Sequence, residues 1–226
     1  MNTKTHASAH AATRRAPGSK VLAARWLLAG VAVVGVLAAV FVTSNSPSAA
    51  PSGSHGSAAY PYAVGKPGLG ELAPPVDLPS TSGKFNLADF RGQNVLLFFQ
   101  EGVLCEGCWT QMRDVETNWK DFQALGVDRV FMVTSDPLDA SREKLAQEGL
   151  GTPTIADPTL VVSRAYDTTS YGMMGDSTNG HSFILVGRDG KIRWRADYGG
   201  APKYFMYIPY PTLLNDLKTA LGGKPL

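Results

Sequence analysis

The sequence predicts one α/β domain, in which helices flank a central mixed β-sheet in three layers, behind a single N-terminal transmembrane helix. Three observations predict this. An uncharged apolar run lies near the N-terminus, Ser/Pro/Gly/Ala-rich sequence follows it, and from about residue 71 strand-like apolar runs alternate with amphipathic helical runs. The last part, roughly 155 residues, is long enough to bury a sizeable core.

The transmembrane prediction rests on residues 26–42, WLLAGVAVVGVLAAVFV, which contain no charged side chain. Together with residues 21–24 before Arg25, this run reaches the length that a helix needs to cross the hydrocarbon layer. No Asp or Glu precedes Glu71, and the nearby positive charge all stands on the N-terminal side, at Arg14, Arg15, Lys20 and Arg25. The positive-inside bias therefore predicts a single-pass anchor in the cell membrane, with a cytoplasmic N-terminus and an extracytoplasmic domain.

A cleaved signal peptide, which would release a secreted domain, is the alternative. Residues 48–50 are small, as a signal peptidase requires. Pro51 makes this a poor cleavage point, and the apolar run is longer than a usual signal core, so the anchor is favoured.

The expected parts are a cytoplasmic tail over residues 1–20, the anchor over 21–43, a flexible linker over 44–70 and the folded domain over 71–226. The linker is predicted because its composition cannot bury enough apolar surface to fold alone. The net charge is only +2, and basic residues of the domain are interspersed with acidic ones. Nucleic acid is therefore not expected as a partner.

The domain begins with two predicted strands, Gly83–Leu87 and Asn94–Gln100, on either side of a turn over Ala88–Gly92. The second strand, NVLLFFQ, is an unbroken apolar run, which is typical of a strand covered on both faces. After it, apolar residues recur three or four positions apart and predict a helix; they are Cys108, Met112, Val115, Trp119 and Phe122.

The pattern then repeats. A strand is expected over Arg129–Thr134, a helix over Asp139–Gln147 that Asp136 and Pro137 open, and a short strand over Thr154–Ala156. Helical crossovers of this kind connect parallel strands.

The domain is predicted to close with a hairpin and a helix. Ser182–Val186 and Lys191–Arg195 flank the turn sequence GRDG, and the last helix is expected over Pro211–Leu221. Neither a phosphate-binding glycine loop nor a dinucleotide fingerprint occurs, so no cofactor is expected.

Cys105 and Cys108 are the two cysteines of the chain, and both lie at the junction between the apolar strand and the predicted helix. Free backbone N–H groups and the helix dipole stabilise a thiolate at such a position. The CxxC spacing lets one sulfur attack an external disulfide and the other release the product. We therefore predict a redox-active pair in which Cys105 attacks and Cys108 resolves.

Three other interpretations of the pair remain open but are less favoured. Zinc would need two further ligands, whereas His181 is the only histidine of the predicted domain and no other cysteine exists, so no metal is expected. A structural disulfide across so short a loop would constrain the unfolded chain little. Inert core sulfurs would not need to share a strand-to-helix junction. Glu106, between the sulfurs, either disfavours a thiolate by repulsion or only complements the helix dipole.

The run NVLLFFQEGVLCEGCWTQMRDVE, with GELAPPVDLPSTSGKFNLADFRG before it and SFILVGRDGKIRW after it, resembles the peroxiredoxin-like branch (alkyl hydroperoxide reductase/thiol-specific antioxidant) of the thioredoxin superfamily. It is also similar to membrane-anchored thioredoxin-like thiol-disulfide oxidoreductases. The resemblance covers about Gly70–Leu221 and implies a thioredoxin-like fold.

The resemblance to peroxiredoxins places Cys108 at the peroxidatic position. The family's proline, hydroxyl residue and arginine are replaced by Glu101, Cys105 and Gly180, which argues against efficient peroxidase chemistry. The cis-proline of thioredoxins is also missing, because the corresponding sequence reads Asn179-Gly180-His181-Ser182. His181 is then expected near the sulfurs, either as a group that steadies a thiolate or carries a proton, or as a hydrogen-bonded residue without a catalytic part.

Other aromatic and sulfur-containing residues have two interpretations each. Trp109 either covers one side of the site or belongs to the core. A loop with Tyr166, Tyr171, Met173 and Met174 either lines a substrate groove or covers the sheet edge. The aromatic segment over residues 194–210 is a docking surface or, by default, core.

The preferred hypothesis is a membrane-anchored extracytoplasmic thiol-disulfide oxidoreductase that reduces disulfides of exported proteins and is reset by a membrane or envelope redox partner. The first alternative is a peroxiredoxin-type antioxidant peroxidase, with Cys108 peroxidatic and Cys105 resolving. The second alternative is a non-catalytic binding module that keeps the thioredoxin fold.

Overall fold

The computed structural model describes residues 55–226. The predicted cytoplasmic tail and anchor, and the predicted linker up to residue 54, lie outside this part of the chain. Within residues 55–226, no helix is both long and apolar enough to cross a lipid bilayer. The predicted anchor and its topology therefore stay predictions.

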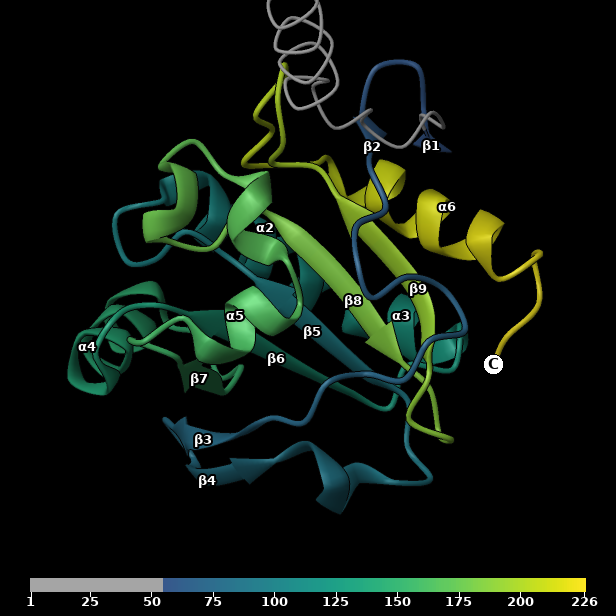
Figure 1. The fold of residues 1–226 in the computed structure, drawn as a ribbon. Helices are drawn as coiled ribbons and strands as arrows, with labels where there is room; N and C mark the ends of the chain where they lie inside the picture. Colours follow the sequence, from purple (N-terminus) through teal and green to yellow (C-terminus); the bar gives the residue numbers. More distant parts are fainter. Residues whose placement is uncertain (1–54) are drawn as a thin grey trace, which may run out of the picture. The chain divides into compact units, whose positions relative to one another are not determined.

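A seven-stranded mixed sheet forms the centre of the domain (Figure 1). Its order is β4-β3-β7-β6-β5-β8-β9, and β5, β6 and β7 pair in parallel whereas the other pairs are antiparallel. The strands are β3 (Asp77–Ser80), β4 (Gly83–Asn86), β5 (Val95–Phe99), β6 (Arg129–Thr134), β7 (Thr154–Ala156), β8 (Ser182–Val186) and β9 (Ile192–Asp197). The predicted mixed α/β sheet is confirmed.

Five helices belong to the described part of the chain: α2 (Glu106–Thr117), α3 (Trp119–Ala124), α4 (Leu138–Glu148), α5 (Val161–Ala165) and α6 (Tyr210–Ala220). Single 3-10 turns occur at η1 (Leu87–Phe90), η2 (Thr168–Tyr171) and η3 (Gly175–Ser177). Figure 1 shows α6 beside β9 and the β3–β4 hairpin at the opposite edge of the sheet.

The sheet is buried on both faces, as the unbroken apolar run of β5 predicts. Leu96 and Phe98 of β5 contribute to one core cluster, which also receives residues of α2, α3, α4 and α6. Leu97 and Phe99 contribute to a second cluster, which receives Val162 from α5. Alternate residues of one strand point to opposite faces, so this one segment joins the two cores.

Two details of the predicted elements are corrected. The stripe that predicted one helix after Cys105 spans two, because the chain breaks at Asn118, whose side-chain amide donates to the carbonyl of Asp114 (2.9 Å). Asp136 does not open α4, which begins after Pro137 without a side-chain cap. Its carboxylate instead accepts the backbone N–H of Val103 (2.7 Å), in the loop before the cysteines.

The expected flexible linker over residues 44–70 is also corrected where it is described. Ala63 pairs with Asp197 of β9 through two backbone hydrogen bonds (2.9 and 3.0 Å). The Tyr62 ring packs against Trp194 and Tyr198. Two short strands, β1 (His55–Gly56) and β2 (Pro61–Tyr62), pair in this segment. A composition averaged over 44–70 hides these anchoring residues, so the structured domain begins before residue 71.

Candidate active site

Several hydrogen bonds fix the loop that leads from β5 into α2. The side chain of Gln100 accepts the N–H of Gly102 (2.7 Å), and the indole N–H of Trp109 donates to the Gly102 carbonyl (3.2 Å). Gly102 has φ of +121°, and a Cβ there would lie 2.4 Å from Oδ2 of Asp136. A side chain at this position would be strained by the positive φ and would push against the Asp136 carboxylate, which accepts the N–H of Val103 in the loop.

Cys105 and Cys108 are joined in a disulfide, with their Cα atoms 5.3 Å apart. Cys105 is the N-cap of α2, and its Sγ accepts the backbone N–H of Cys108 (3.2 Å). The two sulfurs differ in access, because Cys105 is half-buried whereas Cys108 is only 1% exposed. Cys105 is thus the sulfur that an external molecule meets first.

His181 lies directly behind the buried sulfur. Its Nδ1 is 3.7 Å from Sγ of Cys108, and the ring makes edge contacts with Phe98 (centroids 4.8 Å apart) and Phe183 (5.6 Å). Because the imidazole is completely buried, its pKa falls from 6.5 to about 3. The imidazole is therefore neutral at physiological pH.

This buried imidazole predicts that acid destabilises the fold. In the unfolded chain the imidazole has its ordinary pKa of 6.5, so below that pH only the unfolded state gains the proton until the folded pKa of about 3 is reached. Between pH 6.5 and 4.5, His181 should thus cost about 2 to 3 kcal/mol of unfolding free energy. Urea denaturation of wild type and His181→Gln at both pH values measures this difference.

The His181→Gln variant should lose less stability on acidification than wild type by that amount. The matched control is His55→Gln, which removes an exposed imidazole and should keep the wild-type loss. Equal losses in wild type and His181→Gln would contradict the prediction.

The Glu106 carboxylate belongs to a cluster of ion pairs. It binds Arg113 (2.8 Å) and Lys144 (3.8 Å), and both cations also bind Glu148. These partners neutralise much of its charge, which weakens the predicted repulsion of a thiolate. The Lys144 ammonium also lies 5.7 Å from the centre of the Trp109 ring. Trp109 itself is buried in the core, as its second interpretation held.

A groove of about 450 Å³ borders Cys105. Its wall is mostly apolar, and Leu104 is 97% exposed beside it. The lining residues are Glu101, Val103, Leu104, Cys105, Glu106, Gly107, Asp136, Met173, Met174, Thr178 and Met206. Of the predicted loop residues, Met173 and Met174 line this groove, whereas Tyr166 is buried in the core and Tyr171 packs under Arg195.

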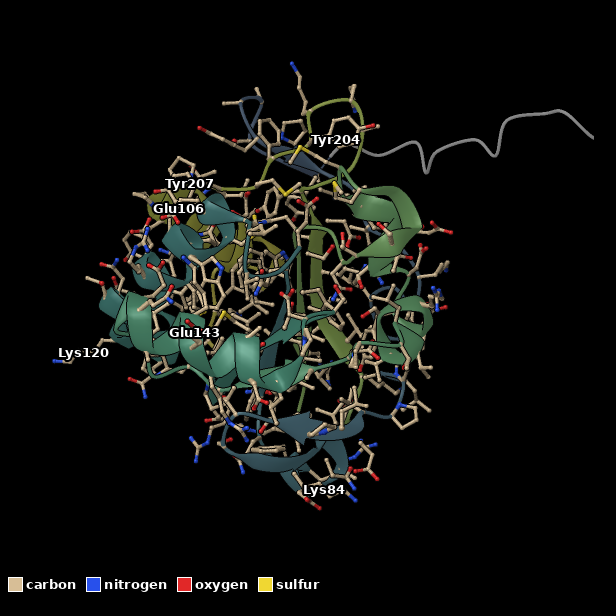
Figure 2. The ribbon with its side chains drawn as sticks, turned by 90° about the vertical axis from the view of Figure 1, so that its left-hand side faces the viewer. Lys84, Glu106, Lys120, Glu143, Tyr204 and Tyr207 are labelled. Carbon is tan, nitrogen blue, oxygen red and sulfur yellow. A yellow bond between two sulfur atoms is a disulfide. The ribbon has the colours of Figure 1, made fainter. Side chains whose placement is uncertain are left out.

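No sequence pattern marks Leu104 or Met206 as groove residues. Leu104 directly precedes Cys105 as one apolar residue among several, and Met206 comes from the segment after β9. The predicted aromatic segment over residues 194–210 is core at its start, since Trp194 and Tyr198 are buried. Figure 2 shows Tyr204 and Tyr207 at the same end of the domain as Glu106, with Lys84 at the other end.

The loop before β8 approaches the neighbouring backbone so closely that Gly180 has no room for a side chain. A Cβ on Gly180 would lie 1.5 Å from the carbonyl oxygen of Tyr171, which accepts the N–H of His181 (3.0 Å). Glu101, where the family's proline would stand, accepts the N–H of Met173 (2.7 Å) and ties this loop to the site. The backbone thus excludes an arginine at position 180.

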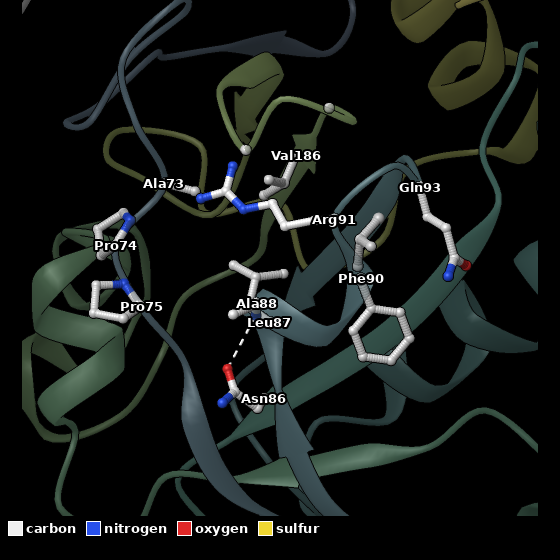
Figure 3. Close-up of a pocket in the computed structure, with 13 residues that line it drawn as sticks. Ala73, Pro74, Pro75, Asn86, Leu87, Ala88, Phe90, Arg91, Gln93 and Val186 are labelled. Atoms are coloured by element: carbon white, nitrogen blue, oxygen red, sulfur yellow. Dashed lines mark hydrogen bonds between the residues drawn. The ribbon is translucent and has the colours of Figure 1, made fainter.

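A second cavity, of about 210 Å³, lies at the other end of the sheet (Figure 3). Its wall includes Val95, at the start of β5, and Val186, at the end of β8, whereas the cysteines follow the end of β5. Figure 3 shows Arg91 among the lining side chains. Neither cysteine nor His181 borders this cavity, so it is separate from the sulfur chemistry.

The AhpC/TSA family model matches residues 69–195, more than half of the chain. The chain belongs to the AhpC/TSA family. It is 34% identical over 133 residues to Rv2521 of Mycobacterium tuberculosis, which carries the name of a peroxiredoxin; the match covers 54% of this chain and 80% of that protein. It is 35% identical over 74 residues to peroxiredoxin Bcp of Escherichia coli, covering 32% and 47%.

Solved structures of other proteins share the fold. Peroxidoxin BcpB of M. tuberculosis superimposes with a TM-score of 0.55 at 16% identity, over 67% of this chain and 96% of that one. A Chlorobium tepidum protein described as the thiol:disulfide interchange protein DsbE gives 0.53 at 24% identity, over 68% and 98%. The domain therefore has the predicted thioredoxin-like fold.

Family membership and the named relatives make the protein a thiol-dependent oxidoreductase. They favour the peroxidase alternative over the membrane-anchored disulfide reductase that the sequence predicted, and they give no support to the anchor. The roles of the individual site residues stay predictions.

Proposed function

We propose that the domain is a thiol peroxidase in which Cys105 reduces the peroxide and Cys108 resolves the product. The observation that supports these roles is the unequal access of the sulfurs: Cys105 borders the groove, and Cys108 is 1% exposed. Family membership supports a peroxide as the electrophile. The resemblance placed Cys108 at the peroxidatic position, so the proposed roles exchange those two residues.

The reaction begins with the dithiol. The Cys105 thiolate attacks one peroxide oxygen, an S–O bond forms, the O–O bond breaks, and the leaving oxygen departs as an alcohol or as water after taking up a proton. Cys108 then attacks the sulfur of the Cys105 sulfenic acid, an S–S bond forms, and the oxygen leaves as water. The product is the disulfide that the structure contains. A dithiol of another molecule must reduce it before the next turnover.

Thiol-disulfide exchange with a polypeptide is the second candidate, and the groove favours it. The wall beside Cys105 is open and mostly apolar, and Leu104, Met173 and Met174 are exposed there. A groove of this size and apolar character suits an extended peptide, whereas a small peroxide does not need one. In this case the Cys105 thiolate attacks a substrate sulfur, and Cys108 releases the substrate as a dithiol.

Stopped-flow kinetics of the complete reduced chain in mild detergent separate the two candidates. We expect hydrogen peroxide and an organic hydroperoxide to react faster than they do with free cysteine at equal thiolate concentration. Each reduced protein should consume one equivalent of peroxide and form the Cys105–Cys108 disulfide.

The comparison reaction uses a peptide that contains one disulfide, under the same conditions. A peroxide rate no higher than that of free cysteine, together with rapid peptide reduction, would contradict the peroxidase proposal and support the second candidate. The expected exported partners and the envelope reductant stay predictions.

A further inference from the structure

Gln111 of α2 is a completely buried polar side chain beside the catalytic pair. Its Oε1 accepts the backbone N–H of Ile208 (2.7 Å) and also lies 3.4 Å from Nε2 of His181. The amide nitrogen of Gln111 has no hydrogen-bond partner within the described residues. The contact with Ile208 fixes the orientation of the amide, because a flipped amide would set its NH₂ donor against the Ile208 donor.

The fixed amide also fixes the proton on His181. An amide oxygen only accepts hydrogen bonds, so Nε2 of His181 must carry the hydrogen. A neutral imidazole has one N–H, and Nδ1 is therefore left with a lone pair. This lone pair faces Sγ of Cys108 at 3.7 Å.

We propose that Gln111 holds His181 in the tautomer whose Nδ1 lone pair faces Cys108, so that Cys108 waits as a hydrogen-bonded thiol and gives its proton to His181 during resolution. Gln111 is then a positioning residue that acts through His181. The inference deepens the proposed function and depends on its assignment of Cys105 as the sulfur that reacts first.

The resolving step follows from this arrangement. The Cys108 S–H proton passes to Nδ1 of His181 as Sγ of Cys108 attacks the sulfur of Cys105. The S–S bond forms, the S–O bond of the sulfenic acid breaks, and the leaving hydroxide takes a proton from solvent at the open groove beside Cys105 and departs as water. His181 returns its proton to solvent, so one thiol and one sulfenic acid yield one disulfide and one water. Before that step, a hydrogen bond to the neutral thiol disfavours its ionisation and keeps Cys108 from competing with Cys105.

The charged groups near His181 form ion pairs or hydrogen bonds with residues other than His181. On β9, Arg195 binds Asp197 (2.7 Å), and directly after β9 the Tyr198 hydroxyl donates to Asp216 (2.8 Å). On α2, Glu106 and Arg113 bind each other at the surface. From β5 and β8 the ring packs against the uncharged side chains of Phe98 and Phe183. The amide of Gln111 is thus the group that distinguishes the two ring nitrogens.

The first test measures the tautomer itself. Two-bond ¹H–¹⁵N correlation spectra of the reduced, isotope-labelled complete chain report which ring nitrogen of His181 is protonated. We expect the hydrogen on Nε2. A hydrogen on Nδ1 would overturn the inference, and this outcome needs no variant that could fail to fold.

The second test measures the ionisation of Cys108 by thiolate absorbance in a Cys105→Ser background, where Cys108 is the single thiol. Gln111→Leu removes the acceptor and frees the tautomer with Nδ1–H, which stabilises a thiolate, so the thiolate fraction at pH 7 should rise about 10-fold. Gln111→Glu restores an acceptor and should return the fraction to the Gln111 level or below it.

An unchanged thiolate fraction in folded Gln111→Leu would overturn the inference. Both measurements are made at equilibrium without peroxide or peptide. The chain can therefore lack peroxidase activity and still show the expected tautomer, or turn over peroxide and fail to show it, which keeps the two failures distinguishable.

Discussion

Replacing Cys105 with serine should lower peroxide turnover by at least about 10³-fold, because the nucleophile that meets the substrate is lost. Replacing Cys108 with serine should also stop turnover, but only after the first chemical step. Cys105 of this variant still faces the groove and still reacts once with peroxide. The resulting sulfenic acid has no second thiol in its own chain.

Mass spectrometry after one equivalent of peroxide distinguishes the two variants. Cys108→Ser should gain one oxygen atom on Cys105 at the wild-type rate, whereas Cys105→Ser should remain largely unmodified because Cys108 is buried. The reverse pattern, with rapid oxygen addition to Cys108 in the Cys105→Ser variant, would show that the peroxidatic position follows the family resemblance. In that case the proposed roles would be wrong.

Replacing Arg195 alone with methionine should lower the free energy of unfolding by about 3 to 5 kcal/mol. Arg195 and Asp197 are fully buried and bind each other at 2.7 Å, and Asp197 also accepts the N–H of Gly65 (2.8 Å). Removal of the guanidinium leaves a buried carboxylate without its charged partner. For a domain of this size, the melting temperature should fall by about 10 °C.

Thermal unfolding of three variants checks this prediction. Arg193→Met is the matched control, because Arg193 is on the same strand but pairs with Asp189 at the surface, so its melting temperature should change little. The double variant Arg195→Met with Asp197→Leu removes both charges and should recover most of the loss. Equal effects of Arg195→Met and Arg193→Met would refute the role of the buried pair.

Much of the fold could be predicted because an unbroken apolar run of strand length indicates a strand that is buried on both faces. The run NVLLFFQ is buried on both faces as β5, and Arg129–Thr134 and Thr154–Ala156 match β6 and β7. Strand β3 was missed because Asp77–Ser80 contains a proline and a single large apolar residue, so its sequence lacks the usual alternation. Its pairing depends on β4, which follows across a turn, and on β7, which is distant in the sequence.

The parts of the site that short sequence motifs encode could be predicted. The CxxC spacing indicates the redox pair, and the resemblance to thioredoxins, which puts Asn179-Gly180-His181-Ser182 at the cis-proline position, implies that His181 lies near the sulfurs, as the structure shows. Gln111 could not be found in this way, because a glutamine within a helical stripe gives no signal by itself. Its meaning depends on Ile208, 97 residues later in the chain, whose N–H orients the amide.

Because Gly180 lies so close to Tyr171, a single substitution cannot introduce at position 180 the arginine that the family resemblance would place there. With 1.5 Å between a hypothetical Cβ and the Tyr171 oxygen, even alanine requires the two backbones to part. The same backbones hold His181 through its N–H. An engineer who wished to install the missing guanidinium would therefore have to rebuild the loop, and in doing so would release the imidazole that stands in its neighbourhood.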